Sequence, residues 1–125
     1  PEYCVELPSI TAGEDTPVHA LLRSASRPTA IVVSDDILAL TLERICTETG
    51  LSIPADLSIL SFNNSLFARL TSPQLTSIDI NSCQLGIEAA AQMISHIENP
   101  ELPATKILVP HQLIERDSCA RPASS

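Results

Sequence analysis

A pair of adjacent carboxylates, Asp35 and Asp36, follows directly after an apolar, β-branched run at residues 30–33. Such a run is typical of a strand that is covered on both faces, as in a parallel sheet. A helical pattern of apolar residues comes next and ends at Gly50, where a left-handed residue is favoured. The pair is therefore predicted at the carboxyl end of a parallel strand, which is the edge where open α/β sheets bind ligands. Carboxylate oxygens at that edge can accept hydrogen bonds from the hydroxyls of a polar ligand.

The same pair also has a purely structural interpretation. Ser34 or Asp35 can cap the following helix, because a side-chain oxygen there accepts from the unpaired amides of the first turn. A carboxylate also lies favourably at the positive end of a helix dipole. The two interpretations are compatible if one carboxylate caps the helix and the other accepts from a ligand.

Two further polar clusters follow predicted strands. Asn63 and Asn64 come after the second apolar segment, and Asp79 begins a cluster after the third. Turn formation alone can explain the two asparagines, since Asn tolerates positive φ. If the strands are parallel, however, all three clusters meet at one edge of the sheet. Neutral and acidic groups together suit a neutral polyol or sugar and suit a phosphate poorly, and the three glycines have no phosphate-binding spacing.

Composition narrows the class of protein. The formal net charge of −8 makes the chain a poor partner for nucleic-acid phosphates, which are bound mainly by Lys and Arg. No apolar run approaches the roughly 20 residues that span a bilayer. No signal peptide is visible at the start of the sequence. Because the sequence begins without Met and within apparent secondary structure, we expect it to be a fragment of a longer chain.

Catalytic and metal-binding arrangements are missing from the sequence. His19, His96 and His111 are scattered without metal-ligand spacing, and no serine stands in a nucleophile elbow. These patterns argue against an enzyme, a cofactor and a bound metal. The four cysteines are widely spaced, at Cys4, Cys46, Cys83 and Cys119. We expect them to be reduced and mostly buried thiols, and the alternative is a zinc site or disulfides.

Predicted strands and helices alternate along the chain. This order favours βαβ units and an α/β fold whose mostly parallel sheet is flanked by helices. The predicted helices begin at Pro17 and after Asp35 and cover residues 66–70 and 82–98. The predicted strands are 3–7, 30–33, 57–62, 75–80, 106–109 and 112–116. The tail from Asp117 to Ser125 has no periodicity, so we expect it to be disordered or loosely packed.

The sequence resembles the effector-binding region of the LacI/GalR family of bacterial transcription repressors. The similarity covers nearly all of residues 27–118, in family order and spacing. The segments that carry it are RPTAIVVSDDILAL (27–40), GLSIPADLSILSFNN (50–64), PQLTSI (73–78), LG (85–86) and HQLIER (111–116). Within the family, SFNNS (61–65) and LTSIDI (75–80) look most like the maltose-operon repressors of Gram-positive bacteria.

The resemblance implies a division into subdomains. The chain would have a type I periplasmic-binding-protein-like fold and correspond to the C-terminal subdomain. Residues 1–118 would form the C-terminal portion of an effector-binding and dimerisation domain, 80–104 would contribute to the other subdomain, and 119–125 would be a tail. The helix at 82–98 would then expose an apolar stripe, which either re-docking or a second copy of the chain would cover.

Position by position, the resemblance implies five effector-contacting residues. Asp36 matches the family aspartate that accepts from the effector's hydroxyls, and Asp35 lies beside it. Asn63 matches the polar residue after the family's glycine–aromatic pair. Ile80 and Ser82 lie in the crossing segment that flanks the effector cleft.

The chain also departs from the family pattern. Ser61 stands where relatives carry glycine, and the crossing segment has no aromatic residue to stack on a ligand. The family's dimer interface is expected in this subdomain, and an apolar patch is our candidate for it, with ordinary core packing as the alternative. The patch comprises Leu66, Phe67 and Leu70.

The implied function is effector sensing and dimerisation within a cytoplasmic, sugar-responsive repressor. Maltose or a related sugar would be the effector, the protein would be a homodimer, and an N-terminal domain outside these residues would bind operator DNA. Effector binding between two subdomains would shift their relative orientation and so change operator affinity.

Two alternative classes stay open on the residues alone. A periplasmic sugar-binding protein would use the same edge, but the cysteines and the family order favour a cytoplasmic regulator. A receiver-like phosphoacceptor domain also has an acidic pair at a strand end. It needs a Lys at the end of its last strand, whereas Lys106 begins a predicted strand here.

Overall fold

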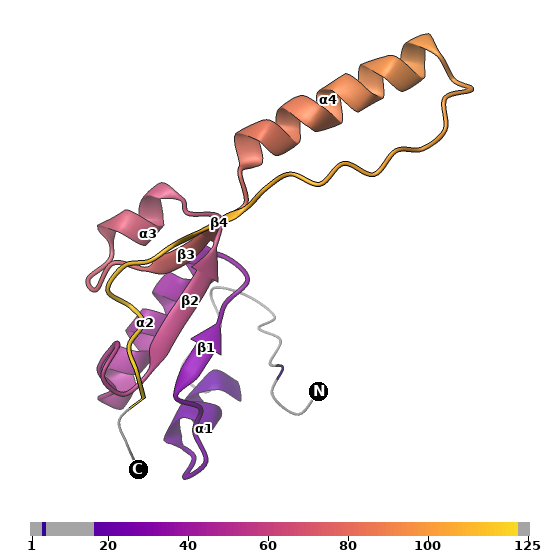
Figure 1. The fold of residues 1–125 in the computed structure, drawn as a ribbon. Coiled ribbons are helices and arrows are strands. Elements are labelled where there is room, and N and C mark those ends of the chain that lie inside the picture. The colour runs from indigo at the N-terminus through magenta and orange to yellow at the C-terminus, as the bar shows by residue number, and fades with distance from the viewer. Residues whose placement is uncertain (1–3, 5–16, 123–125) are drawn as a thin grey trace.

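The computed structural model describes Cys4 and residues 17–122 of the chain. The described residues form one sheet in the order β1-β2-β3-β4, comprising β1 (Ala30–Val32), β2 (Ser58–Phe62), β3 (Thr76–Asp79) and β4 (Gln112–Ile114). The first three strands are mutually parallel, and β4 is antiparallel to β3. The helices are α1 (Pro17–Arg23), α2 (Asp36–Thr49), α3 (Leu66–Leu70) and α4 (Ser82–Glu98). The predicted α/β fold with a mostly parallel sheet is confirmed (Figure 1). The strand predicted at 3–7 lies outside the described residues, apart from Cys4.

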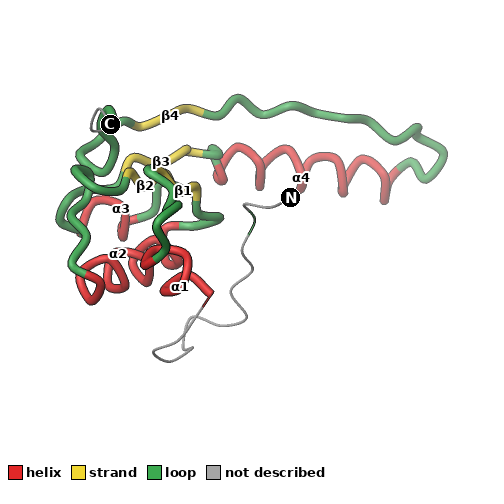
Figure 2. Tube along the Cα trace, turned by 90° about the horizontal axis from the view of Figure 1, so that it is seen from below, coloured by secondary structure: helices red, strands yellow, loops and turns green. Residues whose placement is uncertain are grey.

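The core lies between the sheet and the helices α1, α2 and α3, which are all on one side of the strands (Figure 2). In β2 the side chains alternate, so that Ile59 and Ser61 are fully buried against the helices while their neighbours are half-buried. Aliphatic side chains fill this core, as the low aromatic content requires. The buried apolar residues are Val18, Leu22, Ala39, Leu42, Ile45, Cys46, Leu57, Ile59, Ala68 and Leu75.

Helix α2 has the two caps that its sequence predicts. Asp35 is the N-cap, and its Oδ1 accepts from the backbone N–H of Leu38 over 2.8 Å. Gly50 follows the last turn with φ 75°, a left-handed conformation that glycine adopts at little cost. The helix is therefore capped at both ends, and its first residue, Asp36, directly follows the N-cap.

The prediction that the strand at 30–33 is covered on both faces is wrong for this chain. The strand β1 lies at an edge of the sheet, and Val32 is 64% exposed. The reason is that no described helix covers the face opposite α1 and α2 (Figure 2). Ile31 and Val33 point the other way and pack against the core.

Residues 82–111 form an arm that extends away from the sheet (Figure 1). The arm consists of α4 and an extended return segment. No residue of α4 is buried, so this helix is not re-docked onto the chain, and the other predicted alternative, a second copy that covers the stripe, stays a prediction. Residues 106–109 are not a strand because they belong to the return segment of the arm, away from the sheet, and have no partner strand there. The apolar residues exposed on the arm are Leu85, Ile87, Met93, Ile94, Ile97, Leu102, Ile107 and Leu108.

The start of the tail is packed against the sheet, which contradicts the expected disorder for residues 117–120. Ser118 is fully buried, its Oγ accepts from the backbone N–H of Thr76 over 2.8 Å, and its backbone oxygen accepts from Ile59 over 2.9 Å. The physical reason is that β3 begins only at Thr76 and leaves the first half of β2 unpaired on that side. The start of the tail, at Ser118, lies in this position beside the first half of β2.

All four cysteines are free thiols, but only Cys46 is buried. The prediction of mostly buried thiols is wrong because the other three lie on the arm or near the chain ends. No helix in the described ranges has the length and apolar character needed to cross a membrane.

Candidate functional site

The carboxyl ends of β1, β2 and β3 meet at one edge of the sheet, which we call the carboxyl edge. The three strands are parallel and in register, so Ser34, Asn63 and Asp79, which follow or end these strands, lie along the same edge. This confirms the predicted convergence of three polar strand ends. Any ligand that the edge holds would face carboxylate, hydroxyl and amide groups.

The structure places Asp36 beneath this edge and not on it. The side chain is 1% exposed, and its carboxylate is surrounded by three residues, Ser61, Ser65 and Ser77, which together with Asp36 we call the Asp36 cluster. Oδ1 accepts from Ser61 Oγ over 2.6 Å and from Ser77 Oγ over 2.9 Å. Oδ2 accepts from the backbone N–H of Ser65 over 2.6 Å. In this arrangement the Asp36 carboxylate is buried and bonded to three protein donors, so the predicted direct contact with an effector would require the residues that cover it to move.

The Asp36 cluster keeps its carboxylate ionised. Burial alone raises the pKa of Asp36, but hydrogen bonds from Ser61, Ser65 and Ser77 outweigh burial and hold the pKa below its ordinary value. The three donors come from β2, from the residue before α3 and from β3. The cluster therefore ties the first turn of α2 to three neighbouring elements.

A second set of polar contacts lies above the Asp36 cluster, at the surface of the carboxyl edge. Nδ2 of Asn64 donates to Oδ2 of Asp79 over 3.0 Å, and the backbone N–H of Asn81 donates to Oδ1 of Asp79 over 2.8 Å. These bonds lower the pKa of Asp79, with the Asn64 amide as the larger cause. Nη2 of Arg116 donates to Oδ1 of Asn64 over 2.6 Å, which sets the orientation of that amide.

The other residues expected at the site lie around this network. Asp35 is half-buried and caps α2, while Asn63 is exposed with φ 93° and has no side-chain hydrogen bond within the described ranges. Ser82 is exposed at the start of α4. Ile80 lines a shallow apolar cavity of about 320 Å³ together with Phe62, Ile78, Leu85, Val109 and His111.

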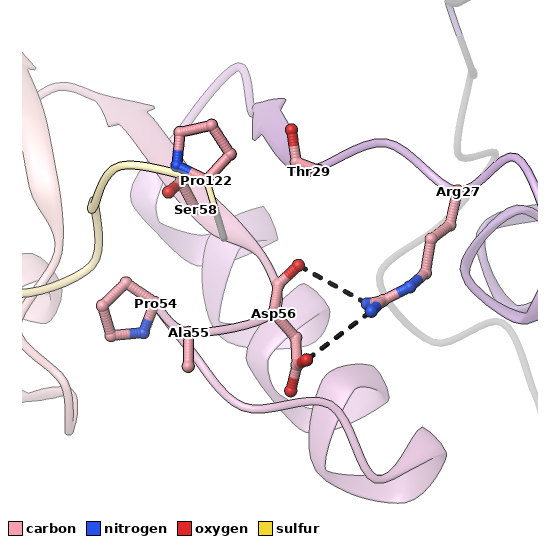
Figure 3. A pocket seen from close by; sticks show the side chains of 7 residues that line it. All are labelled: Arg27, Thr29, Pro54, Ala55, Asp56, Ser58 and Pro122. Atoms are coloured by element: carbon pink, nitrogen blue, oxygen red, sulfur yellow. Dashed lines mark hydrogen bonds and ion pairs between the residues drawn. The ribbon is translucent and has the colours of Figure 1, made fainter. Parts of the chain in front are cut away.

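A smaller cavity of about 160 Å³ lies at the opposite, amino edge of the sheet (Figure 3). Thr29 and Ser58, which stand at the starts of β1 and β2, help to line it. Nη2 of Arg27 is 3.5 Å from the carboxylate of Asp56, and Nη1 donates to the backbone oxygen of the same residue over 3.4 Å. The one guanidinium in this cavity is therefore already paired, and no polar group expected at the site lies there.

The residues expected at the dimer interface are exposed. Leu66, Phe67 and Leu70 are 61%, 44% and 69% exposed, so core packing does not account for them. Ile37 in the first turn of α2 is also an exposed apolar residue, and α2 packs against α3. The patch is available to a partner molecule.

The arrangement favours hydrogen bonding over catalysis. No group of His, Cys, Asp or Glu in the described part of the chain could hold a metal ion. The receiver-like alternative needs an acidic pair that is open to Mg²⁺, whereas Asp36 is enclosed by serines. Sequence reasoning placed Asp79 in a polar cluster but did not include it among the site residues, and it missed Arg116 and Ser77. Arg116 ends a predicted strand and the family segment HQLIER (111–116), and neither pattern indicated its contact with Asn64.

Comparisons with known proteins define the class of protein. The family model described as "Periplasmic binding protein-like domain" matches residues 3–119, and the chain belongs to this family. The HTH-type transcriptional repressor PurR of Pectobacterium carotovorum is 35% identical over 103 residues, which are 82% of this chain and 30% of that relative. The chain thus spans about 30% of the length of this curated relative.

Solved structures narrow the class further. The transcriptional regulator LacI from Bacillus cereus subsp. cytotoxis has a TM-score of 0.79 and 39% identity over 82% of this chain and 36% of its own. A LacI family regulator from Enterococcus faecium, solved with bound ribose, has a TM-score of 0.73 and 32% identity over 86% of this chain and 39% of its own. The chain therefore corresponds to part of the effector-binding domain of LacI-family transcriptional regulators. These relatives are regulators and not enzymes, in agreement with the prediction from the sequence. None of the relatives named here is described as a maltose regulator.

Proposed function

We propose that this chain is the effector-contacting and dimerising portion of a cytoplasmic, sugar-responsive transcription repressor of the LacI type. The carboxyl edge of the parallel sheet carries this proposal, because three strand ends bring carboxylate, hydroxyl and amide groups together there. Arg116 is the basic side chain in contact with this edge, and its guanidinium is already bonded to Asn64 and to the backbone oxygen of Leu75. The edge therefore suits a neutral polyol better than an anion.

The effector in this proposal is a sugar that contacts Asp35, Asn63, Ile80 and Ser82. The apolar cavity beside Ile80 would cover one face of the sugar ring, while the polar groups accept from its hydroxyls. Ribose is supported as a first candidate by the Enterococcus faecium regulator, which was solved with it. Maltose is a second candidate from the sequence resemblance.

The whole repressor would divide as the resemblance implies. Residues 1–118 belong to the effector-binding and dimerisation domain, 80–104 contribute to a second subdomain, and 119–125 are a tail. The arm supports this division, since α4 projects from the sheet and buries none of its residues. A DNA-binding domain outside this chain would contact the operator, and a homodimer would form through Leu66, Phe67 and Leu70.

Amide chemical shifts of the isotopically labelled chain test the proposal. Ribose, maltose and ribose 5-phosphate are titrated separately, because half of a cleft is expected to bind only with a Kd of about 1 mM, or roughly −4 kcal/mol. We expect a neutral sugar to shift the amides of Ser34, Asn63 and Asn81, and we expect ribose 5-phosphate to bind more weakly than ribose. Shifts confined to Arg27 and Asp56 at the amino edge, or the absence of shifts with both neutral sugars, would overturn it.

A further inference from the structure

The two aspartates at the carboxyl edge differ in what they can offer a ligand. Asp36 is 1% exposed, and its two oxygens already accept from Ser61, Ser77 and the backbone of Ser65. A sugar hydroxyl could reach this carboxylate only if the residues that enclose it moved apart. Oδ1 of Asp36 has no free acceptor position, and Oδ2, which accepts one bond, is enclosed in the protein interior, so burial keeps this carboxylate from a ligand.

Asp79 has the opposite properties. It lies at the end of β3, is only partly buried, and has no ion-pair partner among the described residues. Oδ1 accepts one bond from the backbone of Asn81, and Oδ2 accepts one from Asn64. Each carboxylate oxygen has two lone pairs, so each keeps a position for a further donor. Two adjacent hydroxyls of a sugar ring could occupy these positions.

A continuous chain of hydrogen bonds connects the two aspartates. Ser77 Oγ donates to Asp36 and accepts from the backbone N–H of Asn64 over 3.0 Å. The side-chain amide of Asn64 then donates to Asp79. The buried carboxylate thus fixes the position of Asn64, and Asn64 fixes the carboxylate at the surface.

We propose that Asp79 accepts hydrogen bonds from the hydroxyls of an uncharged polyol or sugar, and that Asp36 is a positioning residue that acts on Asp79 through Ser77 and Asn64. This inference rests on the proposed function, because it assumes that the effector binds at the carboxyl edge. It changes which carboxylate touches the effector. It also assigns Ser77 and Asn64 to the site, which the sequence resemblance did not include.

Side-chain carboxyl ¹³C resonances separate the two aspartates during a ribose titration of the labelled chain. We expect the Asp79 resonance to move together with the amides of the edge while the Asp36 resonance stays fixed. If the edge amides move, and Asp36 responds while Asp79 does not, this inference is wrong and the proposed function stands. If no edge amide moves, the proposed function itself fails, and the inference fails with it.

Two variants test the separate roles. Asp79→Asn removes the charged acceptor, so we expect ribose affinity to fall about tenfold or more with little change in unfolding stability, as for the loss of hydrogen bonds to a charged group. Asp117→Asn is the matched control, because Asp117 is exposed and its side chain makes no hydrogen bond within the described ranges. Equal ribose affinity in both variants would overturn the role of Asp79.

Ser77→Ala breaks the link between the two aspartates. A positioning role predicts that the pKa of Asp79 rises toward its ordinary value and that ribose binding weakens, because Asn64 is no longer held. A merely structural role for Ser77 would lower unfolding stability and leave the titration of Asp79 unchanged. That second outcome would refute the positioning mechanism.

Discussion

Nη2 of Arg116 donates to Oδ1 of Asn64 over 2.6 Å, which joins residues that are 52 positions apart in the sequence. The same guanidinium donates through Nη1 to the backbone oxygen of Leu75 over 2.6 Å. With its oxygen bound to Arg116, the amide of Asn64 turns its nitrogen toward Asp79. The segment after β4 therefore helps to shape the carboxyl edge, although it lies far from that edge in the sequence.

Replacing Arg116 by Lys tests this contact. A lysine ammonium lacks the planar fork that makes both bonds, so we expect a loss of about 1–3 kcal/mol in the free energy of unfolding. Urea denaturation measures the loss. Arg121→Lys is the matched control because Arg121 is exposed and has no hydrogen bond in the described part of the chain. If both variants unfold at the same urea concentration, the Arg116 contacts contribute nothing to stability.

The Asp36 cluster predicts a loss of stability in acid. The folded-state pKa of Asp36 lies below its ordinary value of 3.8. The contribution of this carboxylate to the free energy of unfolding is therefore complete above pH 3.8 and is lost as the pH falls through the lower folded-state pKa. Asp36→Asn should reduce the free energy of unfolding at neutral pH by about 1.5–3 kcal/mol, as for bonds to a charged group. The difference between the two proteins should shrink below pH 3.8, and a constant difference across the pH range would contradict this account.

Glu43 predicts a separate pH effect of the opposite sign. Burial raises its pKa to about 7, and Oε1 has no hydrogen-bond partner among the described residues. The contribution of Glu43 to the free energy of unfolding is complete below its ordinary pKa of 4.5 and is lost as the pH rises toward the folded-state pKa of about 7. Glu43→Gln should abolish this decline and be more stable than the parent above pH 7 by about 1–3 kcal/mol, the cost of an unsatisfied buried group.

Denaturation of the Glu43→Gln variant between pH 4.5 and 8 provides the measurement. Glu98→Gln at the exposed end of α4 is a suitable control, since its carboxylate is in solvent. A parent protein whose stability is constant across this interval would show that Glu43 is ionised in the folded state.

The exposed patch on α3 predicts self-association. Leu66 and Leu70 are 61% and 69% exposed, and replacing both by Ser should weaken a dimer that uses them. Light scattering over a range of concentrations should show a dimer for the parent and a monomer for the double variant. The matched control is Met93→Ser with Ile97→Ser on the arm, where the exposed fractions are 62% and 72%. If only the arm variant is monomeric, the interface lies on α4.

Local sequence patterns were sufficient for most of the fold. The caps of α2 at Asp35 and Gly50 are short-range features, and both were predictable from residue type. The polar ends of three parallel strands were also predictable, because parallel pairing brings them to one edge. Exposure of Val32 was not predictable, since it depends on which elements cover the second face of the sheet.

The finer arrangement of the site needed the structure. Three serines that are at least 25 positions from Asp36 in the sequence surround its carboxylate, and no local pattern reports such contacts. The burial of Ser118 was also not predictable, because it depends on β3 being too short to pair with the first half of β2. A carboxylate at a strand end can therefore be located from sequence, but its accessibility to a ligand cannot.

A crystal structure of the chain grown with ribose tests the central claim most directly. The account predicts ribose at the carboxyl edge, with its hydroxyls within hydrogen-bond distance of Asp79 and with Asp36 still bonded to Ser61 and Ser77. Ribose located only in the cavity beside Arg27 and Asp56 at the amino edge, or bonded to Asp36 in place of those serines, would contradict it.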